Sequence, residues 1–122
     1  MQEETIVRIR VSGNVIQILG LNGYVLFQSR FEHPEDAEAL SYWLVDTTAE
    51  MDWSAYEGTL CIYPHDERYP EEFQLKFPNE EARQHAFLIL EQCLEINRSS
   101  DKRFITLGRG IEVIETEQGR KN

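Results

Sequence analysis

The cluster with the most obvious chemical potential is His65, Asp66 and Glu67, in a loop bounded by Pro64 and Pro70. A histidine beside carboxylates can act as a general base or as a metal ligand. The side chains of three consecutive residues diverge, however, and no HxxxH or CxxC pair completes a metal site. We therefore interpret this cluster as a solvated charged loop and predict no metal ligand and no cofactor.

Other candidate catalytic groups also have simpler structural interpretations. No GxSxG motif is present, and Cys61 and Cys93 fit the pattern of buried, reduced thiols in a strand and a helix. The Gly108-Arg109-Gly110 segment lacks the GxGxxG pattern and leads into a strand, so it predicts a hairpin turn rather than a phosphate loop. The sequence thus predicts a protein that is not an enzyme.

Charge is the most uneven property of the chain, whose formal net charge is −10. Residues 31–97 hold 16 carboxylates against Arg68, Lys76 and Arg83, whereas residues 98–111 carry an excess of cations. Such a surface disfavours direct binding to nucleic acid or to an anionic membrane. Because carboxylates attract lysine and arginine at long range, it favours a basic protein partner.

The expected function is therefore that of a non-enzymatic acidic binder of a basic, nucleic-acid-handling protein. The classes considered are inhibitors, including inhibitors of nucleic-acid-guided defence complexes, immunity proteins and antitoxins. The predicted partner contacts are exposed carboxylates of the acidic segment: Glu35, Asp36, Glu38, Asp66, Glu67, Glu71 and Glu72.

Two alternatives stay open. One is a small-molecule binder or enzyme with an aromatic-lined pocket near His65, formed by Trp43, Trp53, Tyr56 and Tyr63. The other is a self-associating structural domain that forms a homodimer.

Residues 5–31 predict three antiparallel strands joined by tight turns at Gly13-Asn14, of type II′, and at Asn22-Gly23. The predicted cross-strand rows are Arg10–Gln17–Gln28, Arg8–Leu19–Leu26 and Ile6–Leu21–Tyr24. One face is almost wholly apolar and predicts core: Val7, Ile9, Val11, Ile16, Ile18, Val25, Phe27 and Phe31. The mixed opposite face is either internally covered or an interface whose candidate residues are Arg8, Arg10, Leu19, Leu21, Tyr24 and Leu26.

The rest of the chain predicts a helix over 35–48, a connector over 49–58, strands over 59–63 and 72–77, a helix capped by Asn79, and a hairpin over 104–115. The fold class is α+β, in the order βββ-α-ββ-α-ββ: a mainly antiparallel sheet with both helices on one face, flat or curled towards a partial barrel. Residues 1–116 form one domain and 117–122 a polar tail. The acidic amino terminus lacks signal-peptide features, and no apolar run approaches the ~20 residues of a membrane span. We expect a cytoplasmic protein.

Overall fold

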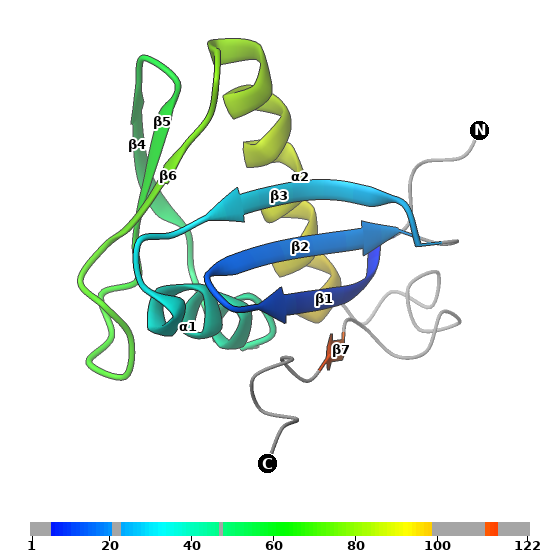
Figure 1. Ribbon diagram of the computed structural model, residues 1–122. Helices are drawn as coiled ribbons and strands as arrows, with labels where there is room; N and C mark the ends of the chain where they lie inside the picture. Colours follow the sequence, from blue (N-terminus) through cyan, green and yellow to red (C-terminus); the bar gives the residue numbers. More distant parts are fainter. Residues whose placement is uncertain (1–5, 21–22, 47, 99–111, 115–122) are drawn as a thin grey trace.

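The computed structural model of the protein has an α+β fold, in which the described residues form two separate sheets and two helices (Figure 1). The structure describes residues 6–20, 23–46, 48–98 and 112–114. The first sheet has the strand order β3-β2-β1-β7 and the second the order β4-β5-β6. The predicted single sheet, and its curling towards a barrel, are therefore wrong: the described strands form two open sheets.

The opening meander consists of β1 (Ile6–Ser12), β2 (Val15–Gly20) and β3 (Val25–Arg30). Gly13 has φ +60° while Asn14 keeps an ordinary φ, as the predicted type II′ turn requires. Ser12 pairs with Val15, and the row Arg10–Gln17–Gln28 is confirmed. Asn14 Nδ2 also donates to the Phe31 carbonyl at 2.6 Å, which secures the end of β3 against this turn.

A β-bulge at Leu26 changes the predicted register beyond this row. Ile18 pairs with Phe27 and Leu19 with Val25, so Leu26 has no partner in β2. Since one extra residue exchanges the faces of all residues beyond it, Val25 is 49% exposed instead of lying in the core. The carbonyl of Leu26 lies 3.2 Å from His85 Nε2, which joins the bulge to the second helix.

An irregularity in β1 also corrects the last predicted row. Ile6 pairs with Gly20 and not with Leu21, because the register shifts between Ile6 and Arg8. Leu21 and Asn22 lie outside the described residues. Six residues of the predicted core are confirmed, since Ile9, Val11, Ile16, Ile18, Phe27 and Phe31 are all buried, while the side chain of Val7 lies outside the described part of the chain.

The second sheet contains a strand that the sequence analysis assigned to a connector. It consists of β4 (Asp52–Tyr56), β5 (Thr59–Tyr63) and β6 (Phe73–Lys76). The β4–β5 turn is Glu57-Gly58, with φ +45° and +77°, which defines a type I′ hairpin. Glutamate is an unfavourable residue at positive φ, so of the two turn residues only Gly58 indicated a type I′ turn in the sequence.

The helix α1 (Pro34–Leu44) follows β3 in the chain, and the helix α2 (Glu80–Arg98) follows β6. His33 occupies the N-cap position of α1 but makes no side-chain capping bond. Asn79 caps α2 as predicted, with its Oδ1 accepting the Ala82 amide at 2.8 Å. The first helix ends at Leu44, earlier than predicted, where the backbone turns towards β4.

The second helix connects the two sheets. It contacts β5 on one side and β3 on the other, while α1 packs on β1 and β2 (Figure 1). Phe27 of β3 and Phe77 after β6 meet edge-to-face at 6.0 Å. Cys93 lies in this core and Cys61 is buried in β5, so the predicted burial of both thiols is confirmed. Burial raises the pKa of the Cys93 thiol well above its ordinary value.

The described end of the chain adds a strand to the first sheet. β7 (Glu112–Ile114) pairs in parallel with β1, with Ile9 opposite Val113. Parallel strands cannot be joined by a tight turn, so this pairing depends on a long-range contact that no local pattern indicates. The predicted strand over 104–107, the turn at 108–110 and the tail over 117–122 lie outside the described residues.

Candidate interaction surface

The loop between β5 and β6, residues 64–72, is held to the end of α1 by Asp46. Its carboxylate accepts hydrogen bonds from the Tyr69 hydroxyl at 2.7 Å and from the Thr48 amide and hydroxyl at 2.9 and 2.7 Å. The Tyr69 hydroxyl and both Thr48 donors lower the pKa of Asp46 to about 2. Burial and the bond to Asp46 raise the pKa of Tyr69 to about 12. Asp46 is therefore an anchor of this loop that is ionised at neutral pH.

Arg68 belongs to the same loop and neutralises part of its negative charge. Its Nε and one terminal nitrogen donate to the two oxygens of Asp66 at 3.1 and 2.7 Å, and the same terminal nitrogen reaches Asp46 at 3.1 Å. The guanidinium carbon lies 5.3 Å from the centre of the Tyr69 ring. Hydrogen bonds from Arg68 lower the pKa of Asp66. Asp66 is thus already paired within the chain.

His65 is not part of a triad with its sequence neighbours. Its backbone has φ +55°, a conformation in which histidine is several-fold enriched. This conformation directs the ring towards β4, where Nε2 lies 2.8 Å from Asp52 Oδ2. The predicted divergence of His65, Asp66 and Glu67 is consistent with this arrangement, because His65 and Asp66 have different partners.

These residues line a small cleft, which we call the His65 cleft, of about 290 Å³. Its lining residues come from the end of α1, the start of β4 and the β5–β6 loop: Trp43, Asp46, Thr48, Ala49, Glu50, Met51, Asp52, Pro64, His65, Asp66 and Tyr69. Of the four aromatic residues predicted to line a pocket here, Trp43 does so. Trp53 instead packs on Phe87 with ring centres 4.4 Å apart.

A wider depression on the same loop, the loop depression, measures about 610 Å³. It combines aromatic rings with acidic residues: Tyr63, His65, Asp66, Glu67, Tyr69, Glu71 and Glu72. Four of the seven predicted partner contacts are among these residues. The structure therefore brings Asp66, Glu67, Glu71 and Glu72 together on one hollowed surface.

A third depression, the junction groove, lies where β6 meets the end of β3 and the start of α1. It measures about 470 Å³ and is lined by Arg30, Phe31, Glu32, Asp36, Glu72, Phe73, Gln74 and Lys76. Glu72 belongs both to this groove and to the loop depression. A fifth predicted contact, Asp36, thereby joins the four of the loop. The three depressions share residues and form one continuous surface, which we call the acidic surface.

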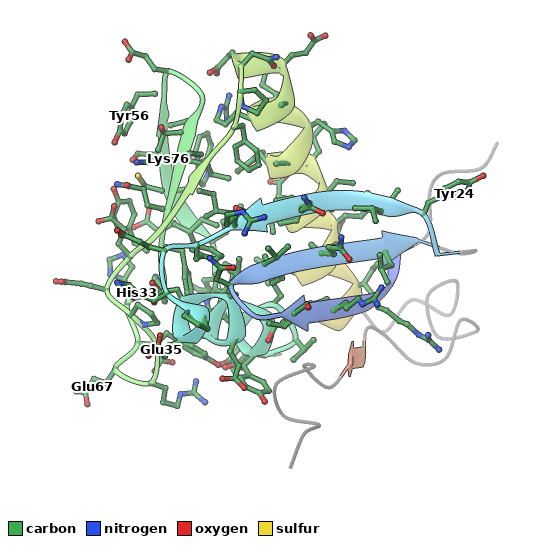
Figure 2. The ribbon with its side chains drawn as sticks, in the orientation of Figure 1. Tyr24, His33, Glu35, Tyr56, Glu67 and Lys76 are labelled. Carbon is green, nitrogen blue, oxygen red and sulfur yellow. The ribbon has the colours of Figure 1, made fainter. Side chains whose placement is uncertain are left out.

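Glu35 and Glu38 line none of these depressions. Both are exposed on α1, and Figure 2 shows Glu35 and Glu67 projecting on the same side of the molecule. The acidic surface also contains Arg30 and Lys76, so the predicted acidic segment forms a mixed surface with a negative excess.

The candidate interface residues on the mixed face of the meander differ in exposure. Arg8 and Arg10 are exposed and Tyr24 is 68% exposed, whereas Leu26 is half-buried. Leu19 is only 7% exposed and so cannot act as an anchor for a partner.

Three residues whose side-chain bonds hold the β5–β6 loop in place were not among the predicted contacts: Asp46, Asp52 and Tyr69. Asp46 and Asp66 each accept the amide two residues further along the chain, from Thr48 and Arg68. An aspartate that bonds its own backbone in this way is a recognised turn signal, and it could have identified both loop ends. The pairing of Asp52 with His65 joins a residue of β4 to a residue of the β5–β6 loop, and it had no local signal.

Comparison of the chain with protein-family models, with curated proteins and with solved structures found no match. Within the described residues, no helix is both long and apolar enough to cross a membrane. The same part of the chain contains no group of three or more histidine, cysteine or acidic residues placed to hold a metal ion.

Proposed function

We propose that the protein is a non-enzymatic, acidic interaction protein whose acidic surface binds a basic protein partner. The partner class that fits best is a nucleic-acid-handling protein, whose own binding groove is lined with lysine and arginine. An inhibitor, an immunity protein or an antitoxin would act in this way, by occupying that groove. The protein would act in the cytoplasm, where such partners occur.

The observation that carries this proposal is the position of Glu72. It lines both the junction groove and the loop depression, and so connects Asp36 of α1 to Glu67 and Glu71 of the β5–β6 loop. Side chains from distant parts of the sequence thus contribute to one negative surface. Complementary potentials of this kind accelerate association and give it a steep dependence on salt.

The hydroxyl groups of the His65 cleft favour a binding protein over an enzyme. A catalytic hydroxyl nucleophile is hydrogen-bonded to its general base. The hydroxyl groups of Thr48 and Tyr69 instead both donate to Asp46 and not to His65. The nearest cation, Arg68, is occupied by Asp66 and Asp46. These polar groups hold the loop in place and do not converge on a reacting atom.

The test is capture of the partner from nuclease-treated extract of the native host, followed by mass spectrometry and by kinetics with the purified partner. We expect a protein with a basic surface whose association slows as salt rises. The variant Glu67→Lys/Glu71→Lys should slow association and flatten this salt dependence. Charge reversal at Glu35, Asp36 and Glu38 should act in the same direction.

A matched control is Glu91→Lys/Glu95→Lys, which makes the same change in charge at two exposed positions of α2. If the two charge reversals slow association equally, net charge is responsible and the acidic surface is not the binding site. A partner without a basic surface would also contradict the proposal.

The His65 cleft supports a second candidate, a small-molecule binder. A compact cavity that places Asp52 and His65 beside Trp43 could hold a small organic cation. Screening a panel of small amines by the chemical shifts of the His65 ring and the Trp43 indole would test it. Shifts that saturate in wild type and vanish in Asp52→Asn would favour this candidate.

The self-association alternative remains a proposal as well, with exposed Tyr24 as its best anchor. Sedimentation of wild type and Tyr24→Asp decides it. An unchanged monomer mass in both would remove the idea, and a wild-type dimer lost in the variant would support it.

A further inference from the structure

The free edge of β4 is an exposed strand edge of the second sheet. The strand ends its sheet, in the order β4-β5-β6, and no described strand lies beyond it (Figure 1). Four of its five residues are exposed and Ala55 is half-buried. Trp53 is 42% and Tyr56 54% exposed, so the edge also presents large apolar surface.

The hairpin geometry shows which main-chain groups face outward. In a two-residue type I′ hairpin the residues flanking the turn, here Tyr56 and Thr59, form a hydrogen-bonded pair. Hydrogen-bonded and non-hydrogen-bonded pairs then alternate along the ladder. Ser54 and Asp52 therefore also bond to β5, and the N–H and C=O groups of Trp53 and Ala55 point away from it.

The edges formed by β3 and β6 are better protected. β3 contains the bulge at Leu26 and packs against β6 through Phe27 and Phe77. β6 carries Lys76, and a lysine on an edge strand discourages pairing with another chain. β4 contains no proline, no lysine and no bulge. It lacks the common devices that prevent an extended segment from pairing with a strand edge.

The side chains of β4 determine what such a segment must look like. Trp53 packs on Phe87 of α2, so Trp53 and Ala55 form the apolar side of the edge. Asp52 and Ser54 lie on the opposite side, where they contact His65 and Tyr63. Each residue of an added strand lies beside a β4 residue and shares its face.

The negative charge on the polar side of β4 determines which kind of segment can bind there. Asp52 is exposed, as are Glu50 just before the strand and Glu57 just after it. The sequence has neither lysine nor arginine between Phe31 and Glu67. A lysine or arginine opposite Asp52 or Tyr56 would gain an ion pair or a cation–π contact, whereas an acidic segment would be repelled.

We propose that the edge of β4 accepts an extended segment of the basic partner, in which lysine or arginine alternates with apolar residues, by adding it as a fourth strand of the sheet. This inference rests on the proposed function, because it assumes that the partner is basic. Main-chain bonds to Trp53 and Ala55 supply affinity, and the two faces of β4 supply selectivity.

The test uses a synthetic nonapeptide of alternating lysine and valine, titrated into the full chain by calorimetry. Amide hydrogen exchange by NMR reports on the edge itself. We expect saturable binding and slower exchange of the Trp53 and Ala55 amides, by on the order of tenfold. A peptide with the same side chains but N-methylated valines should not bind, because it cannot pair with a strand edge.

The matched variants are Ala55→Pro and Ala55→Val. Proline removes an outward N–H and leaves the β5 ladder intact, whereas valine keeps the N–H and suits a strand. We expect Ala55→Pro to weaken peptide binding at least about tenfold and Ala55→Val to preserve it. Circular dichroism confirms that both variants are folded, and Ser54→Thr serves as a second folded control.

Three outcomes would overturn this inference. Equal binding of the N-methylated peptide would mean that charge alone attracts it. Absence of binding by the unmodified peptide would exclude the edge, while the partner kinetics of Glu67→Lys/Glu71→Lys still decide the proposed function separately. A wild-type dimer that Ala55→Pro dissociates would show that a second copy of this chain occupies the edge instead.

Discussion

Replacement of Tyr69 by phenylalanine removes one oxygen atom and tests the hydrogen bond to Asp46 that anchors the acidic surface. The Tyr69 hydroxyl donates to Asp46 at 2.7 Å, and the Asp46 side chain is only 13% exposed. Hydrogen bonds to charged groups contribute about 1.5–3 kcal/mol. Because Asp46 keeps both Thr48 donors and Arg68, we expect the free energy of unfolding to fall by about 1.5 kcal/mol, at the lower end of that range.

The same substitution should also change the titration of Asp46. The Tyr69 hydroxyl is the main reason that the pKa of Asp46 is lowered from 3.8 to about 2, so in Tyr69→Phe the pKa should rise towards 3.8. A carboxyl whose folded pKa is lowered stabilises the fold above its unfolded pKa, and this stabilisation is lost as pH falls through the folded pKa. The stability difference between wild type and variant should therefore be constant near neutral pH and shrink between pH 3.8 and 2.

Urea titration at pH 7 measures the loss of stability, and carbon NMR of the Asp46 carboxyl measures its pKa. Tyr63→Phe is the matched control, since the Tyr63 hydroxyl forms a hydrogen bond with the exposed Ser54 hydroxyl at 3.1 Å rather than with a buried carboxylate. It should cost less than about 0.5 kcal/mol. An unchanged Asp46 pKa in Tyr69→Phe, or equal losses in the two variants, would refute the reasoning.

Three further predictions concern the fold. Phe27→Ala should lower the free energy of unfolding by about 3–5 kcal/mol, because it empties a buried position against Phe77; a loss under about 1 kcal/mol in denaturant titration would show that the register of β3 is wrong. Glu57→Asn should raise the thermal midpoint through a gain of about 0.5–1 kcal/mol, since asparagine tolerates the positive φ of this turn better; an unchanged or lower midpoint would contradict the type I′ assignment. Asn79→Ala should cost about 1 kcal/mol by removing the cap on the Ala82 amide, and Asn79→Asp should restore most of it in the same urea assay; equal stability of all three proteins would count against the cap.

The predictable parts of the fold are those in which one short segment contains the whole sequence signal. The Gly13-Asn14 turn determined the pairing of Ser12 with Val15, because a two-residue loop leaves no other register. Asn79 marked the start of α2 by a bond that spans three residues. β4 was not predicted because glutamate is unusual at the first position of a type I′ turn, although Gly58 at the second position is typical of one.

The charged residues of the acidic surface were predictable from the sequence, but their arrangement in space was not. Composition showed that residues 31–97 are acidic, and five of the predicted contacts lie in connected depressions. The sequence could not show that Arg68 neutralises Asp66, or that Asp46 and Asp52 hold the loop. Side-chain pairing of this kind depends on where separate strands and helices place their residues.

By itself the sequence determined the local turns, the helix start at Asn79, the apolar face of the meander and the sign of the charge. Only the tertiary structure decided that the strands form two sheets, that β7 runs parallel to β1 and that Glu72 connects Asp36 to Glu67 and Glu71. The physical reason is the range of the interactions. Turns and caps are satisfied within a few residues, whereas sheet partners and shared surfaces arise when distant segments pack against α2 and bury their apolar faces together.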